Sequence, residues 1–218
     1  MTLTTHLTHL GLAALLAVAG IAAASEAQMY KGYETPPYSV IRSDGAVELR
    51  RYDPHVVAEV RVRGDRQAAA GRGFRVLAGY IFGKNDGGEK VAMTAPVTQL
   101  PADPQAETWD VQFMMPASFD MDSLPAPEND AIRFTRTEAE TQAVIRFSGF
   151  WTDAKLAAQT EALRSWAAAE GVVLEGAPRF YFYDDPFTLP FNRRNEVAFV
   201  VAEESAAMRA DARHAAVD

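Results

Sequence analysis

Residues 56–83 read VVAEVRVRGDRQAAAGRGFRVLAGYIFG, and this stretch decides the fold class. Apolar and polar side chains alternate from Val56 to Val62, which predicts a half-buried β-strand. Asp65 then stands at an N-cap position, and apolar side chains recur at helical spacing as far as Gly83. A strand followed by an amphipathic helix of this length predicts a mixed α+β protein.

The same order of elements recurs later in the chain. Ala143, Ile145 and Phe147 follow the period of a half-buried strand. Thr152 comes next at an N-cap position, and the helix that it begins is expected to end at Gly171. The two N-caps lie 87 residues apart and the two helix-ending glycines lie 88 apart, which indicates an internal duplication.

A third landmark agrees with this offset. Residues 109–115 (WDVQFMM) match residues 195–201 (NEVAFVV) at a distance of 86 residues. We therefore predict two βαββ units, with strands near residues 46–52, 56–63, 90–98 and 109–115, and then near 131–137, 142–149, 178–184 and 195–201. Because one helix covers only part of the apolar sheet face of each unit, the two units should form one domain. The expected fold is a distorted antiparallel β-barrel with two flanking helices, and its mouth is the expected ligand site.

The first residues have the features of an export signal. Residues 11–24 (GLAALLAVAGIAAA) carry no charge, and this run is shorter than the span of about 20 residues that a transmembrane helix needs. Small residues in A-x-A-like frames end at Ala24 or Ala27, so we predict a signal peptide over 1–27 that is cleaved after either position. The protein is then expected in the periplasm without a stable membrane span. An uncleaved anchor or a buried helix is the alternative, and residues 202–218 are expected to form a flexible tail.

The composition excludes several classes of protein. The chain has 218 residues, a formal net charge of −8 and no cysteine. A nucleic-acid partner would require a basic face, and disulfides, thiolate metal sites and a cysteine nucleophile would require cysteine. The sequence contains no H-E-x-x-H, Walker or G-x-S-x-G motif. Beyond the leader, only His55 and His214 could serve a catalytic triad. We therefore expect a binding protein rather than an enzyme.

Arginines stand close to apolar residues in two places. Arg72 and Arg75 lie beside the apolar face of the first predicted helix, and Arg193 and Arg194 follow an aromatic-rich stretch at residues 180–191. An apolar slot with arginine at its rim suits a planar ring system with carboxylate arms, because each guanidinium can pair with a carboxylate. The alternative is that these arginines are solvated surface residues.

Four stretches closely resemble the signatures of the SOUL haem-binding family. They are KVAMTAPV at 90–97, DPFTLPFNRRNEV at 185–197, ELRRY at 48–52 and YIFGKN at 80–85. The similarity covers roughly residues 33–201. It implies the barrel with two helices that the duplication predicts, and non-covalent, reversible binding of haem or a related tetrapyrrole for storage, scavenging or transfer.

The resemblance also implies where the ligand would lie. In one branch of the family an axial histidine precedes the tyrosine of the ELRRY stretch, but here that position is Arg51, which cannot ligate iron. In the other branch an apolar pocket follows the first helix, and basic side chains reach the propionates. Phe74 keeps an apolar position of that pocket, and Arg72 and Arg75 lie near enough to replace the missing basic ones. The expected contacts are Arg72, Phe74, Arg75, Ala78, Phe187, Leu189 and Arg193.

Two further hypotheses concern other residues. His55 is the only histidine in the region of resemblance, so it is the candidate axial ligand, although a solvent-facing histidine on a turn is the alternative. The tandem βαββ arrangement also resembles the GyrI-like effector-binding domains, which bind small molecules and in some cases hydrolyse them. A hydrolytic member would need a buried carboxylate beside a tyrosine, for which Glu196 with Tyr181 or Tyr183 could serve. A protein-interaction module with a vestigial pocket is the third possibility.

Overall fold

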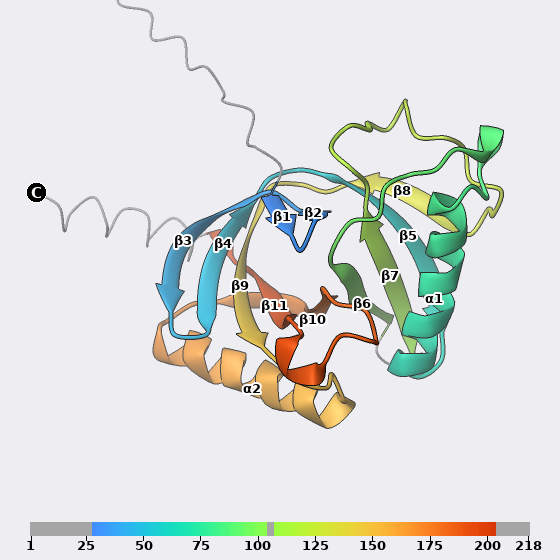
Figure 1. Ribbon diagram of the computed structural model, residues 1–218. Helices are drawn as coiled ribbons and strands as arrows, with labels where there is room; N and C mark the ends of the chain where they lie inside the picture. The colour runs from blue at the N-terminus through green and yellow to red at the C-terminus, as the bar shows by residue number, and fades with distance from the viewer. Residues whose placement is uncertain (1–27, 104–106, 204–218) are drawn as a thin grey trace, which may run out of the picture.

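The computed structural model describes residues 28–103 and 107–203 (Figure 1). The predicted signal peptide lies outside the described residues, as does all but the start of the predicted tail. The described residues form two α-helices, α1 (Arg66–Ile81) and α2 (Asp153–Ala169), and two short 3₁₀ helices, η1 (Asp86–Gly88) and η2 (Pro190–Asn192). The strands are β1 (Gln28–Tyr30), β2 (Tyr33–Thr35), β3 (Tyr38–Asp44), β4 (Val47–Tyr52), β5 (Val56–Arg63), β6 (Val97–Asp103), β7 (Thr108–Met114), β8 (Ile132–Arg136), β9 (Glu140–Phe147), β10 (Leu174–Phe182) and β11 (Asn195–Val201).

Nine of these strands form one antiparallel sheet in the order β3-β4-β9-β11-β10-β6-β7-β5-β8. The two predicted βαββ units meet at its centre, where β6 of the first pairs with β10 of the second. The strand that precedes each βαββ set lies in the other half of the sheet, because β4 pairs with β9 and β8 pairs with β5. The duplication is therefore confirmed in space, and the two units form one continuous sheet.

The sheet is open, so the expected closure into a barrel is not seen. Among the described strands, β3 pairs only with β4 and β8 only with β5. The β1–β2 hairpin lies between these two edges in Figure 1. It contacts the segment before β6, where Glu34 forms an isolated bridge with Thr94 and its carbonyl accepts the Ala95 N–H at 2.9 Å.

Both helices begin and end as the sequence predicts. The Asp65 side chain accepts the Ala68 N–H at 2.9 Å, and the Thr152 side chain accepts the Lys155 N–H at 3.2 Å. Each helix is followed by a glycine in the left-handed region, with φ +109° at Gly83 and +63° at Gly171. This backbone conformation is unfavourable for a residue with a Cβ atom, so glycine is the residue that follows both helices.

The predicted strand at 90–98 is wrong over most of its length. The strand begins only at Val97, because the preceding backbone bonds elsewhere. The Val91 N–H donates to Ile81 at the end of α1, and the Thr94 hydroxyl donates to the Met114 carbonyl at 2.7 Å. Pro96 has no N–H to offer a neighbouring strand. Strands β1 to β3 were not predicted.

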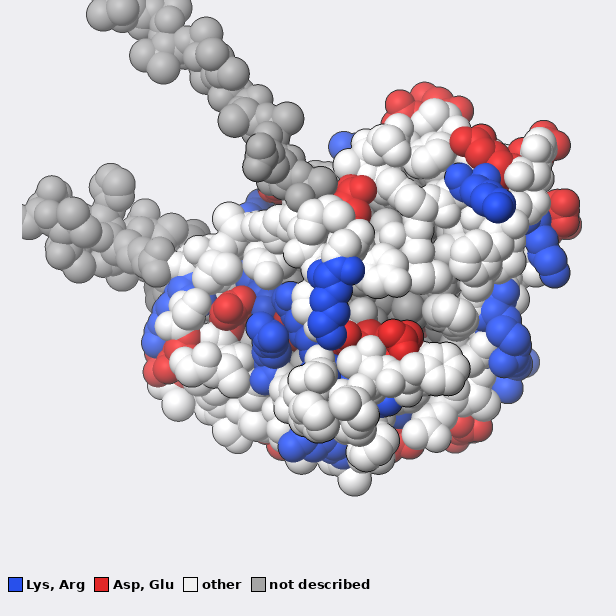
Figure 2. Space-filling model, viewed as in Figure 1, with Lys and Arg blue, Asp and Glu red and all other residues white. Residues whose placement is uncertain are grey.

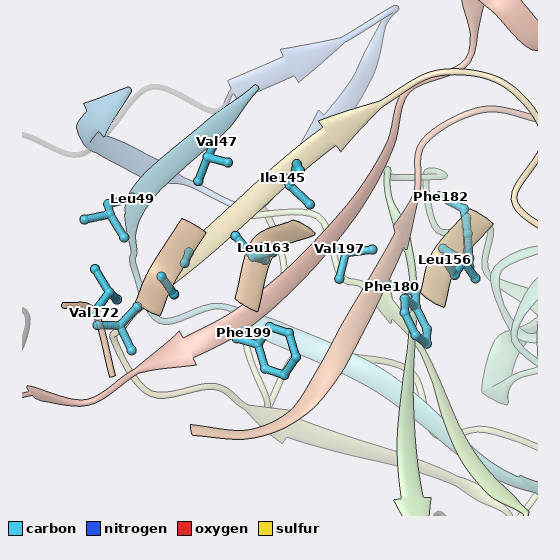
Figure 3. Close-up of a cluster of buried hydrophobic side chains, with 13 residues drawn as sticks. Val47, Leu49, Ile145, Leu156, Leu163, Val172, Phe180, Phe182, Val197 and Phe199 are labelled. Atoms are coloured by element: carbon cyan, nitrogen blue, oxygen red, sulfur yellow. The ribbon is translucent and has the colours of Figure 1, made fainter. Parts of the chain in front are cut away.

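The two helices cover the same face of the sheet. One buried apolar cluster lies under α1 against β5 and β7, and another lies under α2 against β9, β10 and β11 (Figure 3). Phe182 belongs to the cluster under α2, and Val97 packs against the cluster under α1. These two residues are direct partners on β10 and β6, so their side chains lie on the same face of the sheet and the two clusters adjoin there. The opposite, helix-free face carries a third cluster, in which tyrosines predominate.

A candidate ligand groove on helix α1

A groove of about 720 Å³ lies along α1. That volume lies within the range of about 300–1,000 Å³ that is usual for small-molecule sites. One face of α1 forms its first wall, and the segment leading into β8 forms the other. The lining residues are Arg72, Arg75, Val76, Gly79, Tyr80, Lys84, Glu128, Asn129, Asp130 and Ile132.

Three cations line the helix side of the groove. Arg72 and Arg75 lie on neighbouring turns of α1, and Lys84 follows the end of the helix; all three are exposed. Within the described residues none of them forms an ion pair, and Arg72 donates only to the Arg63 carbonyl. These side chains are therefore free to pair with carboxylates of a ligand.

A short turn fixes the position of Lys84. The Asn85 side chain is buried and donates to the carbonyls of Tyr80 and Glu89, at 2.8 Å each. The Glu128 N–H donates to the Lys84 carbonyl at 3.2 Å, which holds the two walls of the groove together. A methyl group on Gly79 would lie 3.2 Å from the Lys84 Cδ atom, so glycine lets the lysine stem lie close to the helix.

The floor of the groove is apolar. Val76, Tyr80 and Ile132 line it, and the Tyr80 hydroxyl donates to the Pro125 carbonyl at 3.0 Å. Burial raises the pKa of Tyr80 to about 12, so the phenol stays neutral. An apolar floor beside three unpaired cations fits a flat apolar ring that carries carboxylates. Glu128 and Asp130 form the acidic part of the rim.

The structure brings together only part of the predicted ligand contacts. Arg72 and Arg75 line the groove, whereas Phe74 and Ala78 do not. Phe74 turns to β7, where its ring lies 5.4 Å from that of Phe113, edge to face. Ala78 is buried in the helix-to-sheet contact.

The remaining predicted contacts lie on the segment between β10 and β11. Phe187 and Leu189 are strongly exposed there, and neither they nor Arg193 lines the groove. The Arg193 guanidinium instead donates to the carbonyls of Thr188 and Pro186, at 2.7 Å each. The predicted contacts are thus divided between the groove and this segment.

His55 lies at neither place. It is half-buried rather than solvent-facing, and it lines a cavity of about 40 Å³ on the helix-free face. Its Nδ1 atom lies 2.9 Å from the Asp53 carbonyl, which can only accept, so Nδ1 carries the proton and Nε2 is the free acceptor. Burial lowers the pKa of His55 despite the opposing effect of that hydrogen bond. The cavity has room for a few water molecules and not for a tetrapyrrole ring.

Glu196 meets Tyr183 on the helix-free face, as the hydrolytic hypothesis requires, with 3.1 Å between the hydroxyl and the carboxylate. The same carboxylate accepts two hydrogen bonds from Arg50, at 2.9 and 3.0 Å, and one from Arg194 at 2.8 Å. Burial alone would raise the pKa of Glu196, but hydrogen bonds and charge from Arg50, followed by those from Arg194, outweigh it and hold the pKa below its usual value. A carboxylate held ionised by two arginines is a poor general base, so this cluster is an internal ion pair.

Sequence reasoning missed several lining residues of the groove. Tyr80 and Lys84 both lie in the YIFGKN stretch, and that signal could have identified them. Glu128 and Asp130 had no such signal, because only the fold brings residues 128–130 to α1.

Comparisons with known structures support the fold. The C-terminal domain of EcmrR is 17% identical with a TM-score of 0.53, over 76% of this chain and 98% of that domain. A hydrolase from Listeria innocua is 13% identical with a TM-score of 0.53, over 74% of this chain and 94% of that protein. Likeness at this identity shows the shared fold alone. Among the described residues, no helix combines the length and apolar character needed to cross a bilayer.

Sequence comparisons identify closer relatives. Heme-binding protein 2 of Mus musculus is 32% identical over 197 residues, which is 85% of this chain and 93% of the mouse protein. Heme-binding protein 2 of Homo sapiens is 30% identical over 194 residues, with 83% and 92% of the two chains covered. The family model described as SOUL heme-binding protein matches residues 33–200. Together with the duplicated α+β fold, this match over most of the chain shows that the protein belongs to the SOUL heme-binding family.

Proposed function

We propose that this protein binds haem, or a closely related tetrapyrrole, in the α1 groove. The observation that carries the proposal is a set of three cations, Arg72, Arg75 and Lys84, that form no ion pair with any described residue and lie above an apolar floor. The ring would lie against Val76 and Ile132, and the arginines would pair with its carboxylates. The names of the relatives support the class of ligand.

The composition of the groove supports reversible, non-covalent binding. None of its ten lining residues is a histidine, methionine or cysteine, the usual side-chain ligands of haem iron together with tyrosine. The one tyrosine, Tyr80, donates its hydroxyl to a backbone carbonyl. The chain has no cysteine, so a thioether bond to the ring is not available. Affinity would then come from ring burial and carboxylate pairing, which suits storage, scavenging or transfer.

The contacts that the resemblance implies outside the groove remain predictions. They are Phe74, Ala78, Phe187, Leu189 and Arg193. Export to the periplasm after removal of residues 1–27 is also a proposal, supported by the uncharged run and the small residues that follow it. Mass spectrometry of the protein recovered from the periplasm tests it, because a new terminus at residue 25 or 28 is expected.

The groove is tested by titrating haemin into the protein and following the Soret band. We expect a saturable one-to-one change that the double variant Arg72→Ala/Arg75→Ala weakens by about tenfold, because two charge-assisted contacts are lost. The matched control is Lys155→Ala/Arg164→Ala, which removes two exposed cations from α2 instead. A change that does not saturate by roughly tens of micromolar haemin, a range well above typical specific affinities, would overturn the proposal. Equal weakening by both double variants would reject the groove as the site.

A further inference from the structure

We propose that the segment between β10 and β11 docks this protein on a phospholipid bilayer, with its apolar side chains inserted at the lipid interface. The side chains that would insert are Phe187, Leu189 and Phe191, together with Phe150 from the turn before α2. We call these four residues the apolar patch. The proposal goes beyond tetrapyrrole binding, and it gives Phe187 and Leu189 a role other than the ligand contact that the family resemblance implies.

The apolar patch is exposed to an unusual degree. The exposed fractions are 94% for Phe187, 57% for Leu189, 70% for Phe191 and 63% for Phe150. The two segments that carry it are tied together, because the Gly149 N–H donates to the Pro190 carbonyl at 2.8 Å. Figure 2 shows a broad uncharged area where this segment crosses the front of the molecule. Contiguous apolar surface of this kind marks a site of interaction.

The patch protrudes from the surface at Phe187. Phe187, at 94% exposure, stands clear of its neighbours, and none of the four side chains lines either cavity described above. A protruding group of large apolar side chains offers no groove in which an extended peptide could lie. It suits a medium that deforms around it, and the interfacial region of a bilayer is such a medium.

Much of the backbone of the segment is paired within the protein. The Asp185 carboxylate accepts the N–H groups of Phe187 and Thr188, at 2.7 and 3.0 Å. Two of the residues are prolines, Pro186 and Pro190, and have no N–H to satisfy. The carbonyls of Pro186 and Thr188 accept from Arg193, and that of Leu189 accepts the Asn192 N–H at 2.9 Å. A loop that faces water does not need such pairing, whereas near lipid each unpaired backbone group is costly.

A cation stands at the base of the patch. The Arg193 guanidinium lies 5.5 Å from the centre of the Phe150 ring, and within the described residues it has no carboxylate partner. In this position it can meet a lipid phosphate while the aromatic rings enter the interface. Lys31, which donates to the Asn192 carbonyl at 3.3 Å, adds a second, half-exposed cation that is paired with Asp184. Because Asp185 also lies at the base, attachment should be mainly apolar and only weakly dependent on salt.

A site-specific label tests the proposal in the full chain. The protein has no cysteine, so Phe191→Cys can carry a single nitrobenzoxadiazole dye, and Phe82→Cys, at 65% exposure on the end of α1, is the matched control. The probe is a vesicle of phosphatidylcholine with one-quarter phosphatidylglycerol. We expect a blue shift and quenching by lipid-borne quenchers at position 191 and neither at position 82. A dye at 191 that stays in water when vesicles are added overturns the proposal.

Vesicle co-sedimentation supplies a second readout. Phe150→Ser/Phe191→Ser should weaken vesicle binding by about tenfold relative to Phe82→Ser, because two large apolar side chains are lost from the interface. Haemin titration of the same variants separates this result from failure of the α1 groove. If the dye at 191 responds to protein concentration alone, the patch is a contact between copies. If it responds to haemin alone, the patch is part of the ligand site. Either response without a vesicle effect rejects membrane docking.

Discussion

The two βαββ halves share their framework and differ in their connections. Both helices begin at a side-chain N-cap and end before a left-handed glycine. In the first half, 15 residues join α1 to β6 and four join β6 to β7. In the second half the lengths are reversed, with four residues between α2 and β10 and 12 between β10 and β11.

Each long connection carries one of the two proposed sites. Residues 82–96 place Lys84 at the α1 groove, and residues 183–194 carry three of the four residues of the apolar patch. The two helices also differ in the pairing of their arginines. Arg75 of α1 has no ion pair among the described residues, whereas Arg164 of α2 lies 3.7 Å from the Glu161 carboxylate. The repeated framework therefore determines the fold, and unequal connections determine what the surface can bind.

The largest effect is expected where the two halves are joined. Arg50 on β4 of the first half and Glu196 on β11 of the second are both buried, with 2.9 Å between their charged atoms. Glu196→Ala leaves the Arg50 charge buried without its main partner. The free energy of unfolding should therefore fall by about 3–5 kcal/mol, as measured by urea denaturation.

A double variant sharpens this result. Arg50→Met/Glu196→Leu removes both charges of the pair, so it should be clearly more stable than Glu196→Ala alone. A double variant as unstable as the single one would mean that packing, rather than the unpaired charge, causes the loss.

A smaller effect should distinguish the two helices. A methyl group on Gly73 of α1 would lie 2.6 Å from the Val111 Cβ atom of β7, so Gly73→Ala must push the helix from the sheet. We expect a loss of about 1–3 kcal/mol in the free energy of unfolding. Thr160 occupies the equivalent place on α2, 87 residues later, and has room for its side chain.

Two controls accompany Gly73→Ala in the same denaturation experiment. Gly71→Ala should be neutral or should stabilise the helix by about 0.5–1 kcal/mol, because its methyl group would meet only the Arg75 side chain at 3.7 Å. Thr160→Ala should change the stability by less than about 1 kcal/mol. If Gly71→Ala costs as much as Gly73→Ala, close approach to β7 is not the cause.

The smallest expected effect is a pH dependence at His55. Its pKa is lowered in the folded protein, chiefly by burial, so the unfolded chain binds the proton first as the pH falls. Neutral His55 makes its full contribution to the free energy of unfolding above about pH 6.5, the usual histidine pKa. This contribution is lost as the pH falls from there through the pKa of His55 in the folded protein. The control variant is His55→Gln, which has no group that titrates in this pH range. Glutamine is chosen because Gln142, at the equivalent position 87 residues later, lines the same cavity.

The measurement compares urea midpoints at about pH 7.5 and about pH 5.5, values on either side of the usual histidine pKa. The midpoint of the natural protein should fall more over this interval than that of His55→Gln. Glu196 and Asp184 also have lowered pKa values, but their carboxylates lose stability only at more acidic pH. Identical pH profiles for the two proteins would contradict the prediction.

Local patterns account for most of the correct predictions. The N-caps Asp65 and Thr152, the glycines after both helices and the strand at 195–201 all follow from residues adjacent in sequence. The exchange of β4 and β8 between the halves was not predicted, and neither was the open sheet, because register and edge pairing are set by distant segments. The β1–β2 hairpin is short and gives too weak an alternation to identify.

The same distinction applies to the groove. Arg72 and Arg75 could be placed on one helix by spacing alone. The opposite wall could not, because residues 128–130 reach α1 only through contacts such as the bridge of Asn85 with Pro127 and the Asp86 N–H bond to the Ala126 carbonyl at 2.8 Å. Contacts across 40 residues or more leave no periodic signal in the chain.

The exchange of first strands has a consequence for the origin of this protein. A single half of this kind, a βαββ set with its preceding strand, would lend that strand to a neighbour and receive one in return, as β4 and β8 do here. Two identical units would then interlock as a symmetric, domain-swapped homodimer. Fusion of the two genes would turn that dimer into one chain without any change in the sheet. Thereafter the two copies would be free to diverge, for example in the lengths of their connections.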